Sequence, residues 1–373
     1  MRLLIAGDFF PSAQVADLFA KKDFGSVLSG VREVVSSADL SVVNLECPVG
    51  GLSPISKVGP ALKCGEEALE ALKYAGFGCV TLANNHINDY GGEGVRNTLG
   101  KVREYSLDSV GAGLNTAEAS KFLVKEIGGI RVAIINCCET EFSIAGDNTP
   151  GACALDPVEQ YNTIREARKV ADKVVVIVHG GYERCRFPSP RMVRTYRFFV
   201  DAGADAVLNH HQHCASGYEV YSGKPIFYGL GNLCFATDNN EGMQWHEGYM
   251  VMLTLQEDMH EPSFSLIPYL QCLDGPSVRL MGPDEERAFL ERIASLNDII
   301  AHPQALKKAF EGFLDQQASV YGRVFSPTGK VAGMLTSAGL LKPFLSERKR
   351  LLLKDYVECE SHREGLTNYL GKD

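Results

Sequence analysis

The chain has 373 residues, of which 45% are hydrophobic and 22% are charged, a balance typical of a folded protein with a sizeable apolar core. Its net charge of −9 argues against nucleic-acid binding, because nucleic-acid-binding proteins usually carry a basic surface. No apolar run is long enough to span a bilayer, and the N-terminal run MRLLIAGDFF is too short for a signal peptide. We therefore expect no membrane anchor and a cytoplasmic location.

Short apolar runs rich in β-branched residues alternate with helical patterns over the first two thirds of the chain. Helices are expected at 66–77, 157–172 and 190–203, the second beginning at a proline and the third ending at a glycine. This alternation is typical of an α/β protein. The expected strands lie at 3–7, 40–46, 79–85, 131–137, 174–181, 205–211 and 225–232.

The last third of the chain has a different pattern. From about residue 249 the strands look antiparallel, and after about 283 the sequence becomes helical and charged. We therefore expect one domain at 1–256 and a C-terminal, mostly helical extension at 257–373. A stretch rich in Gly, Ser and Pro at 50–60 is expected to form a long loop.

Carboxylates, amides and imidazoles follow the expected strands. Ligand sites in open α/β sheets lie beyond the carboxyl ends of the strands. One such residue by itself more often caps a helix or closes a turn, so the prediction of a site depends on their recurrence at six strand ends. The residues are Asp8, Asn44, Glu46, Asn84, Asn85, His86, His179, Glu183, His210, His211, His213 and Asn232.

Three of the nine histidines fall within the segment HHQH at 210–213. In an extended segment the side chains of His211 and His213 project to the same side, so each could bind one of two adjacent metal ions, whereas His210 would point away. Imidazole nitrogen combined with carboxylate and amide oxygen favours Mn, Fe, Zn or Ni over Mg or Ca. Two ions need a shared ligand, and the carboxylate of Glu46 is the natural candidate.

The basic residues and cysteines give weaker signals. A run of arginines after His179 is either a solvated helix face or a positive lip that gathers an anionic substrate, which Lys57 and Lys63 could join. The eleven cysteines include no CxxC pair and fit small buried residues, and Cys359 with His362 offers only half of a zinc site. The arginines are Arg184, Arg186, Arg191, Arg194 and Arg197.

Six motifs occur in an order that resembles the CapA-type family of bacterial capsule-synthesis proteins, which are associated with poly-γ-glutamate. The resemblance covers about residues 1–255, and CESHREGL near the C-terminus is similar to the tail of some members. The family in turn resembles the calcineurin-like metallophosphoesterases, which implies a four-layer α/β/β/α sandwich. The motifs are Gly-Asp at 7–8, NLE at 44–46, ANNH at 83–86 with Asp89, HGGYE at 179–183, DAGADAVLNHHQH at 201–213 and GKPIFYGLGN at 223–232.

The resemblance implies a role for each matching residue. Asp8 and His213 would hold a first metal ion, and Asn85, His179 and His211 a second. Glu46 would bridge the two ions and His86 would be the general acid. The residues expected to contact substrate or to support the ligands are Asn44, Asn84, Asp89, Glu183, Arg184, Arg186, His210 and Asn232.

The sequence departs from the superfamily pattern at three positions. Phe10 stands where the superfamily has a metal-binding histidine, Glu46 replaces an aspartate, and His210 replaces a glycine. The first ion therefore has fewer protein ligands than the superfamily pattern provides.

Three functions fit these observations. The first is a metal-dependent hydrolase that uses one or two Mn, Fe or Zn ions to act on an anionic substrate, either a phosphoester or poly-γ-glutamate or a related capsule polymer. The alternative is a non-catalytic metal-binding accessory protein that works with other proteins of capsule or polysaccharide biosynthesis. The third is an unrelated α/β binding protein whose histidines are coincidental.

Overall fold

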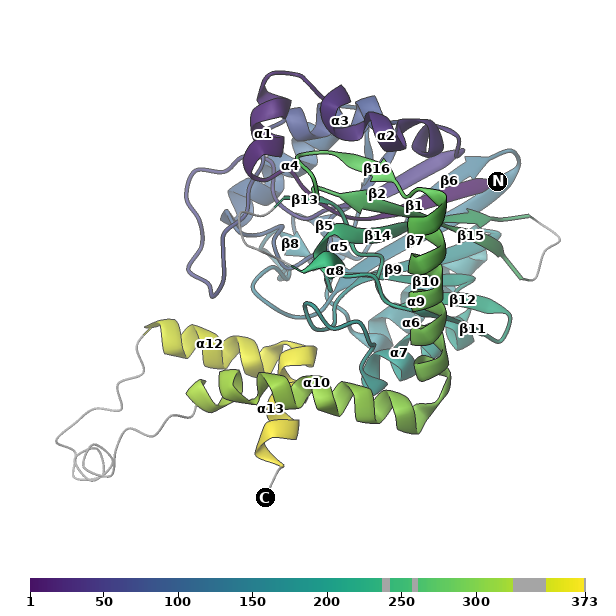
Figure 1. Ribbon diagram of the computed structural model, residues 1–373. Helices are drawn as coiled ribbons and strands as arrows, with labels where there is room; N and C mark the ends of the chain where they lie inside the picture. The colour runs from purple at the N-terminus through teal and green to yellow at the C-terminus, as the bar shows by residue number, and fades with distance from the viewer. Residues whose placement is uncertain (237–241, 257–260, 325–346, 372–373) are drawn as a thin grey trace.

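Two β-sheets form the centre of the fold, and helices cover their outer faces (Figure 1). The computed structural model describes residues 1–236, 242–256, 261–324 and 347–371. The first sheet has the order β16-β15-β14-β1-β2-β3-β4, with β13 also paired to β1. Its strands are β1 (Arg2–Phe10), β2 (Leu40–Leu45), β3 (Cys79–Thr81), β4 (Asp108–Val110), β13 (Asn232–Phe235), β14 (Glu247–Thr254), β15 (Ser263–Gln271) and β16 (Val278–Leu280).

The second sheet has the order β11-β12-β10-β9-β7-β6. Its four inner strands are parallel, and the edge strands β6 and β11 run antiparallel to their neighbours. A separate two-stranded pair joins β5 (Ala112–Gly113) and β8 (Gly151–Ala152). The strands of the second sheet are β6 (Leu123–Ile127), β7 (Ile130–Cys138), β9 (Lys173–His179), β10 (Ala206–His210), β11 (Tyr218–Tyr221) and β12 (Lys224–Phe227).

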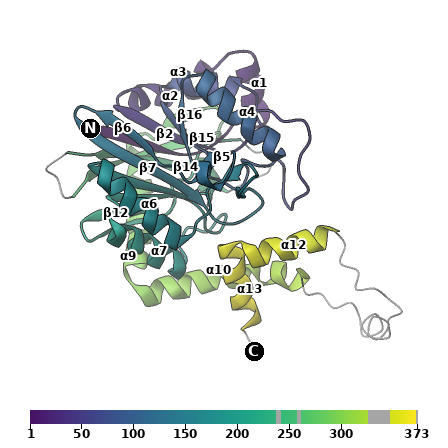
Figure 2. The same cartoon turned by 180° about the vertical axis from the view of Figure 1, so that it is seen from behind.

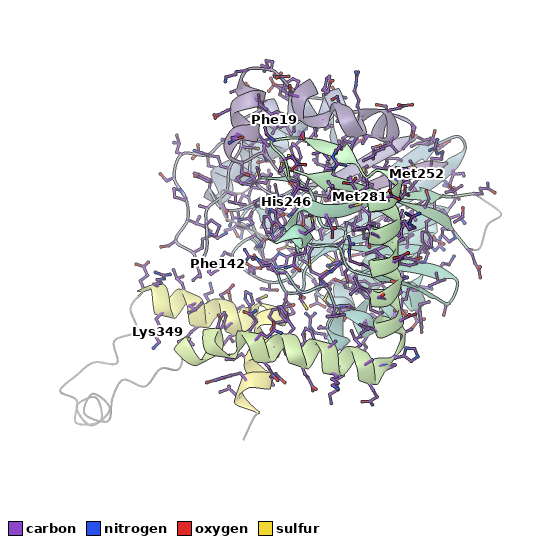
Figure 3. The ribbon with its side chains drawn as sticks, in the orientation of Figure 1. Phe19, Phe142, His246, Met252, Met281 and Lys349 are labelled. Atoms are coloured by element: carbon purple, nitrogen blue, oxygen red, sulfur yellow. The ribbon has the colours of Figure 1, made fainter. Side chains whose placement is uncertain are left out.

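Alternation of side chains along the strands produces the layers. Residues such as Ile5 on β1 and Ile177 on β9 share one buried cluster between the two sheets. Their neighbours in the sequence point outward to the helices. Phe19 of α1, which is labelled in Figure 3, belongs to this outer layer. Its ring stacks on that of Phe9 of β1, with centroids 6.2 Å apart. The predicted four-layer α/β/β/α sandwich is therefore confirmed. The first sheet is covered by α1 (Ala13–Ala20), α2 (Gly25–Ser36), α3 (Glu67–Ala75) and α4 (Gly91–Glu104), and the second by α6 (Pro157–Val170) and α7 (Pro190–Ala202).

Two expected strands end four or five residues earlier than predicted. The expected strand at 79–85 stops at Thr81, and the backbone N–H of Ala83 donates to the side-chain oxygen of Asn136, at 2.7 Å, instead of to a neighbouring strand. The expected strand at 225–232 ends at Phe227, and after a short crossing the chain enters the first sheet as β13.

The crossing from the second sheet to the first depends on glycine. Gly231 has a φ of 79°, which favours a residue without a side chain, and its carbonyl accepts the backbone N–H of Asp8 at 3.1 Å. A Cβ on Gly7 would lie only 1.9 Å from the same carbonyl. This close approach places Asn232 directly beside Asp8 in the parallel register.

The predicted C-terminal helices are confirmed; the first of them runs along the sandwich, and the other three lie together below it in both views (Figures 1 and 2). Strands β15 and β16 lie beyond residue 256 yet pair within the first sheet, while the domain boundary at 256 stays a prediction. Within the described part of the chain, no helix combines the length and apolarity needed to cross a bilayer. The helices are α9 (Pro283–Ala301), α10 (Pro303–Val324), α12 (Glu347–Glu358) and α13 (Glu360–Leu370); the short α5 (Thr116–Ala119) and α8 (Met243–His246) lie earlier in the chain.

A small apolar cluster docks these helices onto the loop that follows β9. Tyr182 and Cys185 of this loop pack with Phe310 of α10, Tyr356 of α12 and Leu366 of α13. The ring centroids of Tyr182 and Phe310 are 5.8 Å apart. Because this loop begins at His179, docking of the helices and the geometry of the candidate site are physically connected.

We predict that Phe310→Ala undocks the C-terminal helices while the sandwich stays folded. Removing a buried phenylalanine costs about 3–5 kcal/mol, and here the loss falls on the contact between α10 and the β9 loop. Hydrogen exchange should become faster in α10, α12 and α13 and stay unchanged in β1 and β9. Phe198→Ala, which truncates an exposed phenylalanine of α7, is the control and should leave exchange in all of these elements unchanged.

Candidate metal centre

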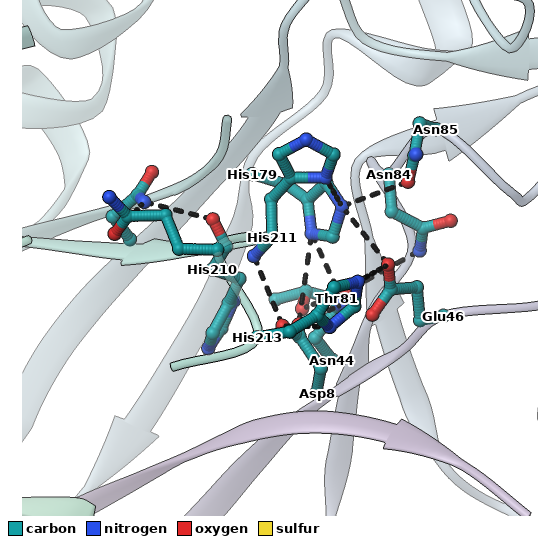
Figure 4. A network of polar contacts seen from close by, with 12 residues as sticks. Asp8, Asn44, Glu46, Thr81, Asn84, Asn85, His179, His210, His211 and His213 are labelled. Carbon is teal, nitrogen blue, oxygen red and sulfur yellow. Dashed lines mark hydrogen bonds and ion pairs between the residues drawn. The ribbon is translucent and has the colours of Figure 1, made fainter. Parts of the chain in front are cut away.

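The candidate ligands come from the carboxyl ends of strands in both sheets (Figure 4). Asp8 lies near the end of β1, Glu46 directly after β2, and His179 ends β9. The backbone N–H of Glu46 donates to the carbonyl of Phe9 at 3.0 Å, which holds it beside β1. All six residues that the resemblance makes metal ligands are buried and come together at this point: Asp8, Glu46, Asn85, His179, His211 and His213.

Two groups of possible ligands share one carboxylate. In the first group, Asp8, Glu46 and His213 place their ligand atoms within 4.8 Å of one another. In the second group, Glu46, His179 and His211 do the same, with His211 Nδ1 3.1 Å from His179 Nε2. Glu46 Oε1 lies 3.5 Å from His179 Nε2 and 3.6 Å from His213 Nε2, so it lies between the groups.

The Glu46 carboxylate shows that the site suits a cation. Both of its oxygens are buried and have no hydrogen-bond partner among the described residues. A buried carboxylate without a partner is costly, and such groups in proteins are normally paired or bound to a metal. The nitrogen and oxygen donors around it are those that Mn, Fe and Zn accept.

Asn85 belongs to the second group, because its Oδ1 lies 3.0 Å from His179 Nε2. Phe10 contributes nothing to the first group, since its ring packs against Phe235 with centroids 5.0 Å apart. Within the described residues the first group therefore has three protein ligands and the second has four.

The backbone of the HHQH segment is not extended, so that part of the sequence interpretation is wrong. His211 and His213 have φ values of 90° and 54°, in the left-handed region that non-glycine residues rarely adopt. The side chain of Asn209 holds this turn by donating to the carbonyls of Gly180 and His210, each at 2.8 Å. Both rings nevertheless face the site, because the left-handed turn redirects them.

His210 points away from the other histidines, as predicted (Figure 4). Its Nε2 lies 2.9 Å from the carbonyl of Ala6, so it ties the turn to β1. No sequence motif indicated the role of Asn209, which Tyr196 also holds through a 2.6 Å hydrogen bond.

Three asparagines hold the ligands in place. Asn44 donates to Asp8 Oδ1 at 2.7 Å, and Asn232 Oδ1 lies 2.8 Å from His213 Nδ1. Asn84 donates to the carbonyl of Leu45 at 2.8 Å, next to Glu46. The contact with Asn232 assigns the proton of His213 to Nδ1 and leaves Nε2 facing Glu46.

His86, Asp89 and Lys57 form a separate polar cluster beside Asn85. His86 Nδ1 lies 2.6 Å from Asp89 Oδ2, and Lys57 Nζ lies 2.5 Å from Asp89 Oδ1. Only 4% of the Lys57 side chain is exposed, so this lysine reaches inward from the predicted 50–60 loop. Lys63 instead lies over the ring of Tyr90 and is not part of this polar cluster.

The five arginines do not form one positive surface. Arg191 pairs with Glu139, Arg197 binds both oxygens of Glu219, and Arg194 is exposed elsewhere on α7. Arg184 lies over the ring of Trp245, 5.8 Å away, and that ring is 5.0 Å from His213. Arg184 and Arg186 also line a pocket of about 590 Å³.

Two further glutamates lie near the centre. Glu183 is partly open to solvent. The protein atoms around its carboxyl group favour a higher pKa, but the charges of His213 and His211 outweigh them and lower the pKa of Glu183. Glu141 has its Oε1 3.9 Å from His211 Nε2, and burial raises the pKa of Glu141 to about 8. The sequence analysis did not single out Glu141, although this residue follows the expected strand at 131–137 just as the candidate ligands follow their strands.

Burial and mutual charge shift the pKa values of the ligands. Burial and the charge of Glu46 raise the pKa of Asp8 to about 6. Burial opposes the charged form of His213, but the charges of Glu46, Glu183 and Asp8 raise its pKa to about 9. Burial lowers the pKa of both His179 and His211.

A comparison with known protein families shows which family this chain belongs to. Residues 2–237 match the family described as bacterial capsule synthesis protein PGA_cap. The chain belongs to this family. The predicted family resemblance is confirmed.

Relatives of this PGA_cap-family chain have related names. The capsule biosynthesis protein CapA of Bacillus anthracis is 37% identical over 246 residues, which cover 63% of this chain and 60% of that protein. The PGA biosynthesis protein CapA of Bacillus subtilis is 33% identical over 234 residues, 61% of this chain and 62% of that protein. A Mycobacterium tuberculosis protein named for an accessory role in polyglutamine synthesis is 27% identical, over 59% of this chain and 61% of that protein. The chain thus spans about three fifths of the length of these relatives.

Solved structures give looser likenesses to this PGA_cap-family chain. A phosphatase from Mycoplasma pneumoniae is 14% identical with a TM-score of 0.41, covering 77% of this chain and 96% of that one. A 5′-nucleotidase from Candida albicans is 14% identical with a TM-score of 0.43, covering 84% and 57%.

We predict that metal affinity rises with pH between about 6 and about 9. Asp8 and His213 must lose protons to bind a cation, and their pKa values of about 6 and about 9 bracket this range. Calorimetric titration with Mn²⁺ in buffers of different ionisation enthalpy should show proton release on binding. Affinity that does not change across this range would contradict the assignment of these two ligands.

Glu46→Gln is predicted to remove most of the stabilisation that metal gives the protein. A ligand at 100 times its dissociation constant stabilises the folded state by about 2.7 kcal/mol, and this variant loses the ligand common to both groups. Thermal unfolding with and without Mn²⁺ measures the difference. Glu126→Gln, on the exposed face of β6, should respond to Mn²⁺ as the wild type does.

Proposed function

We propose that the protein is a metal-dependent hydrolase of the capsule-synthesis family that acts on an anionic substrate, a phosphoester or a poly-γ-glutamate-type polymer. The observation that carries the proposal is the buried carboxylate of Glu46, which has no hydrogen-bond partner among the described residues and is shared by two groups of candidate ligands. The names of the Bacillus relatives support a capsule-related substrate.

The two groups would each hold one Mn, Fe or Zn ion. Asp8 and His213 would bind the first, Asn85, His179 and His211 the second, and Glu46 both. Such a pair of ions supplies a hydroxide nucleophile near neutral pH and stabilises developing negative charge. Because Asn85 is a neutral ligand, it leaves more of the positive charge at the centre than a carboxylate would.

His86 is proposed to protonate the leaving group. Asp89 lies at its Nδ1, so the imidazole is held in one orientation and Nε2 is the nitrogen left for proton transfer. Lys57 compensates the charge of Asp89 in this buried place. Arg184 over Trp245, close to His213, is placed to attract an anionic group of the substrate.

A non-catalytic accessory role is the second candidate. The observation that favours it is the first group, where Phe10 occupies the position of a further ligand and three protein ligands remain among the described residues. The name of the Mycobacterium tuberculosis relative fits this role. The partners would then be other proteins of capsule or polysaccharide biosynthesis.

A cytoplasmic location is part of the proposal. All eleven cysteines are free, and all except Cys272 are buried. Free buried thiols suit a reducing compartment.

Activity screens distinguish the two candidates. The Mn²⁺-loaded protein is expected to hydrolyse an aryl phosphodiester or a γ-glutamyl polymer, and His86→Asn is expected to lower kcat by about 10²- to 10⁴-fold because a general acid is lost. Metal content should stay the same in the variant. His302→Asn, at an exposed histidine between α9 and α10, serves as the control.

A wild-type protein that binds metal but turns over neither substrate class would favour the accessory role. Full activity in His86→Asn would show that His86 is not the general acid.

A further inference from the structure

The carboxylate of Glu141 meets two ligands of the second group from outside. Its Oε2 accepts a hydrogen bond from Asn85 Nδ2 at 3.4 Å, and its Oε1 lies 3.9 Å from His211 Nε2. The Glu141 side chain is 12% exposed, so this contact is largely shielded from water. One buried carboxylate thus faces both an amide and an imidazole that would bind the same ion.

Glu141 faces, on His211 and on Asn85, the nitrogen atom that points away from the proposed ion. His211 turns Nδ1 toward His179 Nε2, at 3.1 Å, and Asn85 turns Oδ1 toward the same nitrogen, at 3.0 Å. His211 Nε2 and Asn85 Nδ2 are therefore the atoms left to face away from the ion. A metal-binding histidine usually donates its outer N–H to a carboxylate or carbonyl, which fixes the ring and strengthens the metal bond.

Helix α13 holds the segment that carries Glu141. The backbone N–H and the hydroxyl of Thr140 donate to the carboxylate of Glu360, at 2.8 and 3.2 Å. On the other side of Thr140, Glu139 pairs with Arg191 and lies 3.8 Å from Cys359 Sγ. The start of α13 therefore holds residues 139–141, which lie between β7 and the candidate metal centre, in place.

We propose that Glu141 is a positioning residue that orients Asn85 and His211 for the second ion, and that Glu360 holds Glu141 in place. Docking of the C-terminal helices then sets the affinity for that ion. The inference rests on the metal centre of the proposed function and adds to it a dependence on residues more than two hundred positions away in the sequence. The family match ends at residue 237, so Glu360 lies outside the matched region.

Metal titration of Glu141→Gln tests the proposal, because glutamine keeps the shape of the side chain and cannot ionise to a carboxylate. The Mn²⁺ ion in the second ligand group should bind about 10- to 100-fold more weakly, as is found when other residues that support metal ligands are replaced. The ion in the first group should bind as in the wild type. Glu360→Gln should also weaken the binding of the ion in the second group, but by a smaller factor. The readouts are competition with a chelating dye and the number of ions per chain by elemental analysis.

Matched variants separate a positioning role from a purely structural one. Glu126→Gln and Glu358→Gln replace exposed glutamates on β6 and α12, the latter only two residues from Glu360, and both should bind metal as the wild type does. Thermal unfolding of the metal-free proteins should be the same for Glu141→Gln and the wild type. A lower unfolding temperature in the metal-free variant, with unchanged metal affinity, would overturn the positioning role.

The outcomes for this inference and for the proposed function differ. If Glu141→Gln binds two ions with wild-type affinity while the wild type is an active hydrolase, only the inference fails. If the wild type binds two ions, the variant binds the second weakly, and neither hydrolyses any substrate, only the hydrolase function fails. A wild type that takes up no ion contradicts both.

Discussion

A buried carboxylate without a hydrogen-bond partner is the constraint on which the rest of the site depends. Glu46 lies at the junction of the two sheets, with one ligand group on each side of it. Desolvation makes its negative charge expensive, and burial accordingly raises its pKa. The surrounding imidazoles and amides place further nitrogen and oxygen donors around this charge, and such a set of donors suits a cation.

The sandwich brings the ligands to Glu46 from both sheets. The first sheet supplies Asp8 and Glu46, and the second supplies His179 and the turn with His211 and His213. The chain crosses between the sheets just before Asn232, and this crossing puts a supporting amide beside Asp8 and His213. The backbone strain of the left-handed turn is tolerated because Asn209 holds it with several hydrogen bonds.

The C-terminal helices are more than an appendage to this arrangement. Tyr182 anchors their apolar cluster three residues after His179, and Glu360 grips the backbone next to Glu141. Both contacts fall on loops that carry or face metal ligands. Segments beyond the family match at residues 2–237 therefore contact the loops that carry the candidate ligands.

The sequence by itself determined an α/β fold, the C-terminal helices and most of the residues that gather at the site, because periodicity and strand-end chemistry are local. The four-layer sandwich was expected only from the family resemblance. It did not determine the turn at His211, since the left-handed conformation depends partly on the hydrogen bond from Asn209 to the carbonyl of Gly180, 29 residues away in the sequence. It also did not separate Arg191 from Arg184, because only the tertiary structure shows that Arg191 pairs with Glu139 whereas Arg184 lies over the ring of Trp245. Only the folded chain shows that Glu141 faces Asn85 and His211 and that Glu360 holds the neighbouring Thr140, because these contacts join residues far apart in the sequence and leave no local pattern.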